Sequence, residues 1–548
     1  MRAGLPGVSY AVILQLHSQT SRAVLLAILL VLAGSARIVS TYTVFNHTID
    51  EPDHLAAGME YLSTGRYLYE DQHPPLARVF GALGPFFSGE RFHPGPDSYH
   101  EGYRILGRDT HYDRTLALGR AGILPFFWIA SAVVFLWALR AAGPRAALLS
   151  TLLFTTLPPV LAHSGLISTD MAAVAFAGAA AFASLLWADV PDGKRTILFG
   201  VCLGLAALSK FSAIPFLAAA LVLMHRRRLY AVAHAFVRAV SRLVSTPRRG
   251  TESLSGPGFG MSADAARTSA CATSRYGLAA LTIALVVVWA GYGFTFARVD
   301  YLHLRLPAPR FFTGLQTHWD HNAAGHASYL FGARGSSGFW YYYPATLALK
   351  TPLAMLLLLP LCFRRNAAQP MLFSLAILLC GLASRINIGT RHVLPIYVGL
   401  AVACGIAAAP LLRRPVARWI VIALLLWQVA SGALQHPDYL SYTNELAGAH
   451  PENFLADSDL DWGQDMKRLA AFLERAHATE VTFVPFNRTY ATLAGHAFPE
   501  MHPGGPAHPS PGWNAVGVSV WKIFGVPSWP DAHPQARIGC SILLWNFK

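Results

Sequence analysis

The chain has 548 residues, of which 54% are hydrophobic and only 13% are charged. Soluble globular proteins carry roughly 25% charged residues, so this composition excludes an ordinary soluble domain and predicts several membrane-spanning segments. The formal net charge of +14 comes largely from arginines that cluster in short gaps between apolar runs. In a membrane protein such clusters indicate which side of the membrane a loop faces, and they do not by themselves indicate nucleic-acid binding. We therefore expect a lipid bilayer around the chain and no nucleic-acid partner.

Apolar runs recur along most of the chain, and a spanning helix needs about 20 apolar residues. We predict an all-α polytopic membrane protein with about eleven transmembrane helices. A run of about 30 residues is divided into two of them, because both of its flanks are basic. The expected helices cover residues 22–45, 119–139, 144–162, 169–188, 196–210, 211–225, 277–297, 341–363, 370–386, 392–412 and 417–434.

Every second gap between these runs is basic, as the positive-inside rule requires. The pattern predicts a cytoplasmic N-terminus, an external C-terminus and a location in the cell inner (plasma) membrane. It also predicts that the short hairpin 196–225 points its tip, Lys210, outward. The basic gaps hold Arg140, Arg145, Lys194, Arg195, Arg226, Arg227, Arg228, Arg364, Arg365, Arg413, Arg414 and Arg418.

The topology divides the chain into a membrane domain, 1–434, and a C-terminal external domain, 435–548. Within the membrane domain we expect external loops at 46–118 and 298–340, and a cytoplasmic loop at 226–276 that is partly disordered. The tail contains a helical stretch near 463–476 and β-like runs at 480–486 and 540–547. It is therefore predicted to form a small α/β domain.

Asp50 and Glu51 directly follow the first apolar run, in the stretch "DEPDH". A helix that starts here would carry His54 one turn after Asp50, and Pro52 fits a first helical turn. This predicts a short interfacial helix in the first external loop with its acidic end beside the membrane. The alternative is an ordinary helix cap, because acidic residues stabilise a first turn.

Further ionisable residues are expected at the same membrane face. Asp170 begins the fourth predicted span, and Lys350 lies about ten residues into another, where an ionisable group is a functional candidate by default. External arginines that break the positive-inside pattern favour an anionic partner. For each residue the alternative is a snorkelling side chain or a local ion pair. The external cationic group consists of Lys210, Arg385, Arg391 and His392.

Three segments carry a resemblance to a known family. "DEPDHLAAGMEYLSTGRYLYEDQHPPLA" (50–77) resembles the first external loop of GT-C glycosyltransferases of the protein mannosyltransferase and aminoarabinose transferase type. "SYLFGARGSSGFWYYYPATLALKTPLA" (328–354) and "DSDLDWGQDMKRLAAFL" (457–473) are similar to segments of bacterial members. The resemblance spans residue 22 to about residue 475.

The resemblance implies an inverting glycosyltransferase that moves a sugar from a polyprenyl-phosphate carrier to a glycan, lipid or protein acceptor outside the cytoplasm. It assigns the general base to Asp50, with Glu51 and His54 orienting the base or the acceptor, and a second acidic position to Asp170. The implied donor-phosphate group contains Lys210, Arg385 and Arg391, with Lys350, His73 and His392 beside them.

One position departs from the family pattern. The aminoarabinose branch has a lysine before "PPL", whereas this chain has His73. A neutral histidine supplies no fixed charge, so we assign no aminoarabinose substrate.

The stretch "DSDLDW" places Asp457, Asp459 and Asp461 at alternate positions, like the start of a calcium loop. An EF-hand needs glycine at its sixth position and glutamate at its twelfth, where this chain has Trp462 and Arg468. The EF-hand interpretation therefore fails. We expect these aspartates to cap the following helix, and a divalent metal remains an open alternative; no other cofactor is indicated.

Two other functions stay open from the sequence. A transporter or flippase for lipid-linked sugars should carry ionisable residues near the bilayer midplane and repeated halves, whereas the carboxylates here gather at one surface. A non-catalytic assembly factor would not need the acidic pair Asp50 and Glu51. Both alternatives are less favoured than the transferase.

Overall fold

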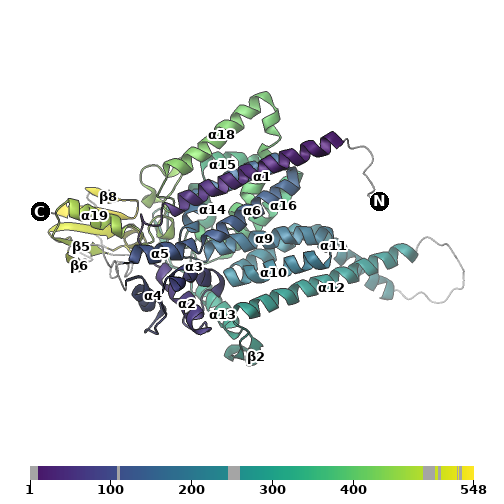
Figure 1. Ribbon diagram of the computed structural model, residues 1–548, viewed down its shortest axis with the longest axis horizontal. Helices are drawn as coiled ribbons and strands as arrows, with labels where there is room; N and C mark the ends of the chain where they lie inside the picture. Colours follow the sequence, from purple (N-terminus) through teal and green to yellow (C-terminus); the bar gives the residue numbers. More distant parts are fainter. Residues whose placement is uncertain are drawn as a thin grey trace.

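The computed structural model describes residues 10–107, 111–244, 260–484, 500–503, 508–526, 529 and 533–547, with the side chains of 10–17, 228–229, 231–274, 500, 501 and 503 left out. Long helices lie side by side as a bundle, and a small sheet near the C-terminus packs at one end of it (Figure 1). The chain is a multi-pass membrane protein.

The bundle contains most of the apolar sequence. Six of its helical segments are long and apolar enough to cross a membrane, or eight if two bent pairs each count as one span, among the residues searched. The bundle helices are α1 (Tyr10–Val39), α6 (Leu124–Ala142), α7 (Pro144–Thr155), α8 (Pro158–Ser164), α9 (Asp170–Asp189), α10 (Gly193–Ser209), α11 (Ala213–Val244), α12 (Gly260–Gly291), α14 (Tyr342–Lys350), α15 (Leu353–Leu358), α16 (Ala368–Ala383), α17 (Ile396–Ala408) and α18 (Pro415–Leu434).

The two bent pairs break at prolines. α7 and α8 meet at 66° before Pro158, and α14 meets the helix that starts at Leu353 at 109°, next to Pro352. Proline has no backbone N–H to donate, and its ring clashes with the preceding turn of a helix. A straight helix therefore cannot continue there. The count of eleven crossings stays a prediction, because α10, α11 and the apolar part of α12 are helical without meeting the length and apolarity of a span.

The expected loop 226–276 is largely helical. α11 continues to Val244 and α12 starts at Gly260. Residues 245–259 lie outside the described part of the chain, so the predicted partial disorder of this loop stays a prediction.

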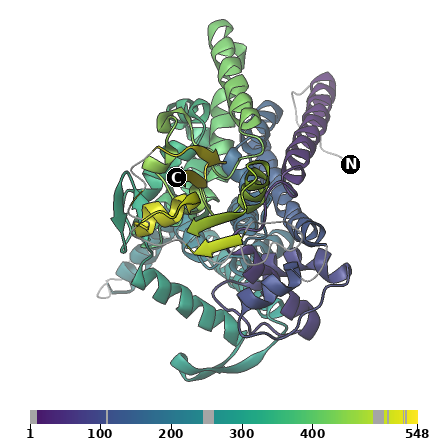
Figure 2. The same cartoon turned by 90° about the vertical axis from the view of Figure 1, so that its left-hand side faces the viewer.

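The first loop folds into short helices, as the sequence predicts. α2 (Glu51–Thr64), α3 (Pro75–Phe87), α4 (Ser98–Gly107) and α5 (Tyr112–Ala121) gather at the end of the bundle near the sheet (Figures 1 and 2). α2 ends at Gly65, whose left-handed backbone (φ 66°) lets its N–H bond the carbonyl of Tyr61. A Cβ at Gly58 would come within 2.1 Å of the Arg78 carbonyl, so α2 and α3 pack backbone to backbone.

The expected loop 298–340 also has regular structure. Two antiparallel hairpins, formed by β1 (Phe296–Val299) with β2 (Leu304–Pro307) and β3 (Ser328–Leu330) with β4 (Ala333–Gly335), flank the helix α13 (Pro309–Ala324).

The tail forms the α/β elements that its sequence predicts. α19 (Met466–Arg475) is followed by a five-stranded sheet of order β6-β5-β7-β9-β8, in which β5 pairs parallel with β6 and β7. The strands are β5 (Glu480–Val484), β6 (Glu500–Pro503), β7 (Gly512–Gly517), β8 (Ala536–Ile538) and β9 (Ile542–Phe547). One hydrophobic cluster joins Leu55 and Met59 of α2 to Leu469 of α19 and Leu544 of β9, so the tail packs directly on the first loop.

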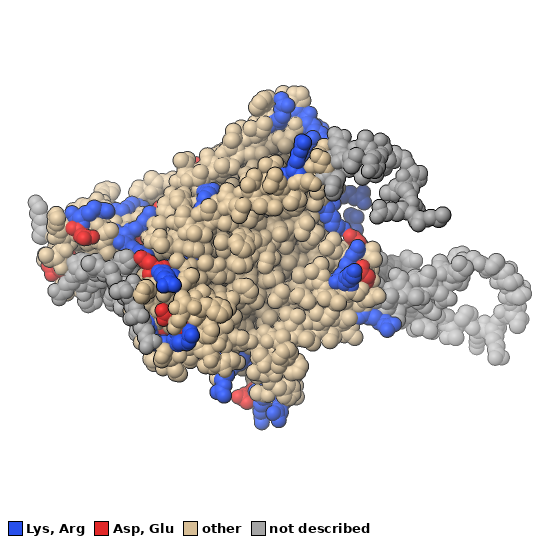
Figure 3. Space-filling model, in the orientation of Figure 1, with Lys and Arg blue, Asp and Glu red and all other residues tan. Residues whose placement is uncertain are grey.

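Lysine and arginine side chains are also present at the end of the bundle away from the sheet (Figure 3). Arg145, Arg364, Arg365 and Arg413, which are far apart in sequence, line one cavity there. The predicted external loops lie at the other end. The gaps predicted to be cytoplasmic and the loops predicted to be external therefore lie at opposite ends of the bundle. The orientation in the membrane stays a prediction.

Candidate active site

Asp50 lies at the N-cap position of α2, but its side chain does not cap the helix. Its carboxylate accepts a hydrogen bond of 2.9 Å from Arg391 Nη1. The Asp50 side chain is 23% exposed, whereas that of Arg391 is only 11% exposed. The helix-cap alternative therefore does not describe this side chain, whose carboxylate remains reachable from solvent.

Arg391 is the cation at the centre of this group. Its guanidinium lies over the Trp462 ring, 4.1 Å from the ring centre, and its buried Nε has no hydrogen-bond partner among the residues that the structure describes. Burial opposes its charge, but the carboxylates of Asp50, Asp170 and Asp457 raise the pKa of Arg391 above its ordinary value. A planar guanidinium with a free N–H suits a phosphate oxygen.

Asp170 and Lys210 form a second, buried pair in the same group. Lys210 Nζ, between α10 and α11, donates to Asp170 Oδ1 at 2.6 Å at the start of α9. The other oxygen, Oδ2, lies 3.7 Å from His163 Nδ1 and has no hydrogen-bond partner in the described part of the chain. The predicted acidic and cationic residues thus lie side by side, and their side chains form local ion pairs.

Glu51 points away from Asp50. Both of its carboxylate oxygens are bonded to Arg120, at 2.9 Å and 2.8 Å, and both accept further backbone N–H groups, from Ile167 at 3.0 Å and Thr48 at 2.7 Å. Burial opposes ionisation, but Arg120 and these hydrogen bonds hold the pKa of Glu51 below its ordinary value. Both carboxylate oxygens of Glu51 are therefore occupied. Glu51 affects the site by holding the backbone that presents Asp50.

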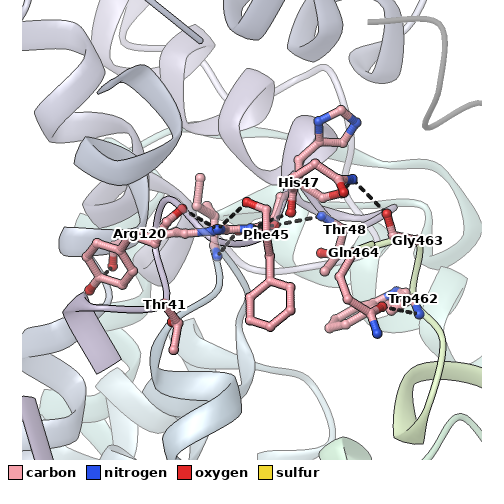
Figure 4. Close-up of polar contacts among 12 residues, drawn as sticks. Thr41, Phe45, His47, Thr48, Arg120, Trp462, Gly463 and Gln464 are labelled. Carbon is pink, nitrogen blue, oxygen red and sulfur yellow. Dashed lines mark hydrogen bonds and ion pairs between the residues drawn. The ribbon is translucent and has the colours of Figure 1, made fainter. Parts of the chain in front are cut away.

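Arg120 organises the segment that leads to Asp50 (Figure 4). Besides Glu51, its guanidinium donates to the carbonyls of Tyr42, Phe45 and Asn46 at 2.8, 3.1 and 2.8 Å. The Asn46 amide in turn donates to the Gly463 carbonyl at 2.7 Å. The end of the first span, α5 and the segment 462–464 are thus tied together, which fixes where α2 begins.

His54 and His73 belong to a network beneath α2. Their rings lie 5.1 Å apart, and His54 Nδ1 accepts from Arg78 Nε at 3.0 Å. Arg78 also binds the carboxylates of Asp53 and Glu70. Burial and the neighbouring Arg78 lower the pKa of His54 well below its ordinary value, so its ring is neutral and carries no charge toward a phosphate.

Three predicted donor-phosphate residues have other neighbours. Lys350 Nζ donates to the carbonyls of Leu440 and Asp459 at 2.7 and 2.6 Å. Arg385 is exposed and donates to the Ala323 carbonyl at 3.2 Å. Lys350 therefore anchors the segment 440–459, and Arg385 binds the end of α13.

His392 is the third of these residues. Its buried ring stacks on Tyr343 with the ring centres 5.7 Å apart. Burial lowers the pKa of His392 well below its ordinary value, so the ring is neutral. A neutral ring supplies no charge to a donor phosphate.

The sequence predicted that the aspartates of "DSDLDW" cap α19, but the structure shows that they do not. Asp459 accepts from the Thr390 N–H and hydroxyl at 3.0 and 2.9 Å, and Asp461 accepts from the Ser519 N–H at 2.9 Å. α19 begins after Asp465, whose side chain makes no cap bond. The capping prediction is wrong because Asp459 joins the tail to the loop before α17, and Asp461 joins two segments of the tail.

In the sequence, Asp457 stands out only through the calcium-like pattern, and no place beside Arg391 is predicted for it. It is buried with a left-handed backbone (φ 58°), which is rare outside glycine and concentrates at functional sites. Its Oδ2 lies 3.8 Å from His326 Nε2, and burial raises the pKa of Asp457 to about 6 although Arg391 opposes that rise. The left-handed backbone of Asp457 is a feature that no sequence pattern reports.

The carboxylates raise the question of a metal ion. Asp50 and Asp170 each face a cationic side chain, Arg391 or Lys210. Within the described residues, no group of three or more histidine, cysteine, aspartate or glutamate side chains is arranged to hold a metal. The geometry gives no candidate ligand set in that part of the chain.

A family model matches part of the chain. Residues 122–246 match the model of dolichyl-phosphate-mannose-protein mannosyltransferases. The resemblance is confirmed over that segment. The matched segment contains Asp170 and Lys210 and ends well before Arg391, and it starts after Asp50. No curated protein matches the sequence.

Several solved structures are similar to the chain. ArnT from Cupriavidus metallidurans bound to undecaprenyl phosphate matches with a TM-score of 0.48 and 13% identity, over 94% of this chain and 97% of that chain. AglB from Archaeoglobus fulgidus in complex with an inhibitory peptide and a dolichol-phosphate gives 0.42 and 14%, over 78% and 56%. The Pmt1-Pmt2 complex of S. cerevisiae bound to the sugar donor gives 0.32 and 16%, over 54% and 34%.

Proposed function

We propose that the protein is an inverting glycosyltransferase that moves a sugar from a polyprenyl-phosphate carrier to an acceptor hydroxyl at the external face of the membrane. The observation that carries this proposal is the Asp50–Arg391 pair: a partly exposed carboxylate 2.9 Å from a buried guanidinium. The mannosyltransferase-family match over residues 122–246 supports it.

In the proposed reaction, Asp50 accepts the proton of the acceptor hydroxyl as that oxygen attacks the anomeric carbon. The bond between that carbon and the phosphate oxygen breaks on the opposite face of the sugar, which inverts the configuration. A positioned general base contributes about 10²–10⁴-fold to such a step. Asp50 leaves the reaction protonated and returns the proton to water.

The leaving polyprenyl phosphate gains negative charge as the bond breaks. Arg391, with its free Nε, is the cation we assign to that charge, and Lys210 is the second. Fixed cations in a site that excludes water stabilise developing charge without rearranging. The donor phosphate would compete with Asp50 for the guanidinium, and binding of donor would thereby release the carboxylate to the acceptor.

The assignment of single residues differs from the sequence-based one. We propose Asp50 as the catalytic base and Arg391 and Lys210 as donor-binding residues. Glu51 becomes a positioning residue through Arg120, and Asp170 positions Lys210. Lys350, Arg385, His73 and His392 receive no contact with the donor in this proposal.

The test uses the full chain reconstituted in vesicles with a panel of polyprenyl-phosphate-linked hexoses and pentoses as donors and a panel of glycan, lipid and protein hydroxyls as acceptors. A transferase converts one of these donors to free polyprenyl phosphate, which mass spectrometry of the lipids detects. A flippase instead moves an unchanged donor between leaflets. Translocation without loss of the sugar, or no effect on any donor or its distribution, would overturn the proposal.

A further inference from the structure

A basic cavity lies at the end of the bundle away from Asp50. Its volume is about 690 Å³, and it is lined by the turn between α6 and α7, by the segment 364–366 and by the end of α17. Four of its lining residues are the arginines Arg145, Arg364, Arg365 and Arg413. α17 starts near Arg391 and runs to this cavity, so the two cationic groups lie at opposite ends of one helix.

These arginines differ from other basic residues at the same end. Arg140 is paired with Asp189, and Arg195 lies 3.5 Å from Asp192. None of the four cavity guanidinium groups has a carboxylate partner within the part of the chain that the structure describes. The positive-inside rule explains why arginines lie at this end, but it does not explain four unpaired ones around one cavity.

An apolar groove continues from this end along the outside of the bundle. Its volume is about 540 Å³, and its walls are one face of α1, one face of α6 and Thr151 of α7. Ile28 and Leu32 of α1 and Trp128 of α6 are about half exposed there, at 50%, 56% and 46%. The lining is almost entirely hydrocarbon and aromatic, which suits an acyl chain.

The two sites are in line on the same helices. On α1 the cavity contacts Gln19 and the groove runs from Val24 to Leu32, while on α6 the cavity contacts Ala142 and the groove runs from Leu136 back to Trp128. At 1.5 Å per residue, both paths are about 20 Å long. One leaflet of a bilayer, with its head groups, has about the same thickness.

We propose that the cavity and the groove together bind one anionic glycerophospholipid of the leaflet at that end. The phosphodiester lies among the four arginines, whose planar forks bind phosphate oxygens in pairs, and an acyl chain fills the groove between α1 and α6. The site is independent of the proposed transferase reaction and contains none of its residues. It would tie α1, α6, α7 and α17 together at this end.

The experiment measures lipid binding to the purified full chain by native mass spectrometry. The probes are phosphatidylglycerol and phosphatidylcholine with identical acyl chains. A triple variant, Arg145→Gln/Arg364→Gln/Arg365→Gln, removes three cavity charges from exposed positions, so the fold should persist. The matched control, Arg140→Gln/Lys194→Gln/Arg195→Gln, removes the same charge from the same end. Ala132→Trp places a large ring on an exposed wall of the groove.

The proposal expects the wild type to prefer phosphatidylglycerol over phosphatidylcholine at least tenfold. The cavity variant should lose that preference, and the control should stay within about twofold of the wild type. Ala132→Trp should weaken phosphatidylglycerol binding several-fold. Equal binding of the two lipids, equal loss in both triple variants, no effect of Ala132→Trp, or displacement of the lipid by inorganic phosphate alone would each overturn the proposal.

Discussion

The carboxylate of Asp50 accepts a hydrogen bond of 2.9 Å from the guanidinium of Arg391, 341 residues later in the chain. Its neighbour Glu51 points the other way, into a buried pair with Arg120. Two consecutive acidic residues thus have separate tasks: one remains reachable from solvent, and the other holds the backbone that presents it. Five consequences of this division and of the surrounding contacts are open to measurement.

Glu51→Gln should destabilise the protein by about 3–5 kcal/mol, because it leaves the buried Arg120 guanidinium without its counter-charge. Thermal unfolding in detergent measures this as a lower Tm. The control is Glu474→Gln, since Glu474 is exposed on α19 and such surface substitutions usually stay within about 0.5 kcal/mol. Equal Tm values for the two variants would contradict the positioning role of Glu51.

Arg391→Gln should weaken the binding of polyprenyl phosphate at least tenfold, because the substitution removes the cation that we assign to the phosphate. Equilibrium binding of a fluorescent polyprenyl phosphate provides the measurement. Arg385→Gln is the matched control, since Arg385 lies in the same loop but donates to the Ala323 carbonyl. The affinity of this variant for polyprenyl phosphate should stay within about twofold of the wild type. A similar loss in both variants would show that only the general positive charge of the loop matters.

Lys350→Met should lower the Tm and leave the affinity for polyprenyl phosphate within about twofold. The substitution removes two hydrogen bonds, to the carbonyls of Leu440 and Asp459, and leaves the nearby Asp459 carboxylate buried without its ammonium. The sequence alone predicts a donor-phosphate role for this lysine instead. A stable Lys350→Met protein that no longer binds the carrier would favour that earlier prediction.

Asp457→Asn should make the protein more stable at pH 8 and change the pH dependence of its Tm. Burial raises the pKa of Asp457 to about 6, above the ordinary value of 3.8, against the opposing charge of Arg391. The folded protein therefore holds a proton that the unfolded chain has lost between about pH 4 and 6, so this group costs stability as the pH rises through that window.

Asparagine has nearly the same shape and tolerates a left-handed backbone, so the fold at Asp457 should persist. The charged groups that face this position are Arg391, Asp50 and Asp459, with His326 beside them. The variant's Tm should exceed that of the wild type at pH 8 and approach it at pH 4. A variant that is less stable at pH 8 would mean that the ionised carboxylate is required by Arg391.

The proximity of Asp50 and Arg391 was predictable in outline from local sequence signals, while their roles stay predictions. Asp50 follows an apolar run, and Arg391 breaks the charge pattern of the loops. Each signal lies within a few residues of the side chain it concerns. The α/β elements of the tail, such as α19, were predictable for the same reason, because hydrophobic periodicity is local.

Partners distant in sequence were not predictable. Glu51 and Arg120 are 69 residues apart, and Lys350 reaches a carbonyl 109 residues away. Such contacts decide whether a carboxylate can act as a general base or is half of a buried ion pair. The spacing of residues along the sequence does not show these contacts. Asp457 was hidden for another reason: its left-handed backbone is a property of the folded chain.

The most direct measurement of the central claim is a single-turnover sugar transfer by Asp50→Asn protein preloaded with the lipid-linked donor. Asp300→Asn is the control, because the side chain of Asp300 is 99% exposed. We predict that Asp50→Asn binds donor within about threefold of the wild type and transfers its sugar about 10²–10⁴-fold more slowly. Transfer by Asp50→Asn within a few-fold of the Asp300→Asn control would contradict the account.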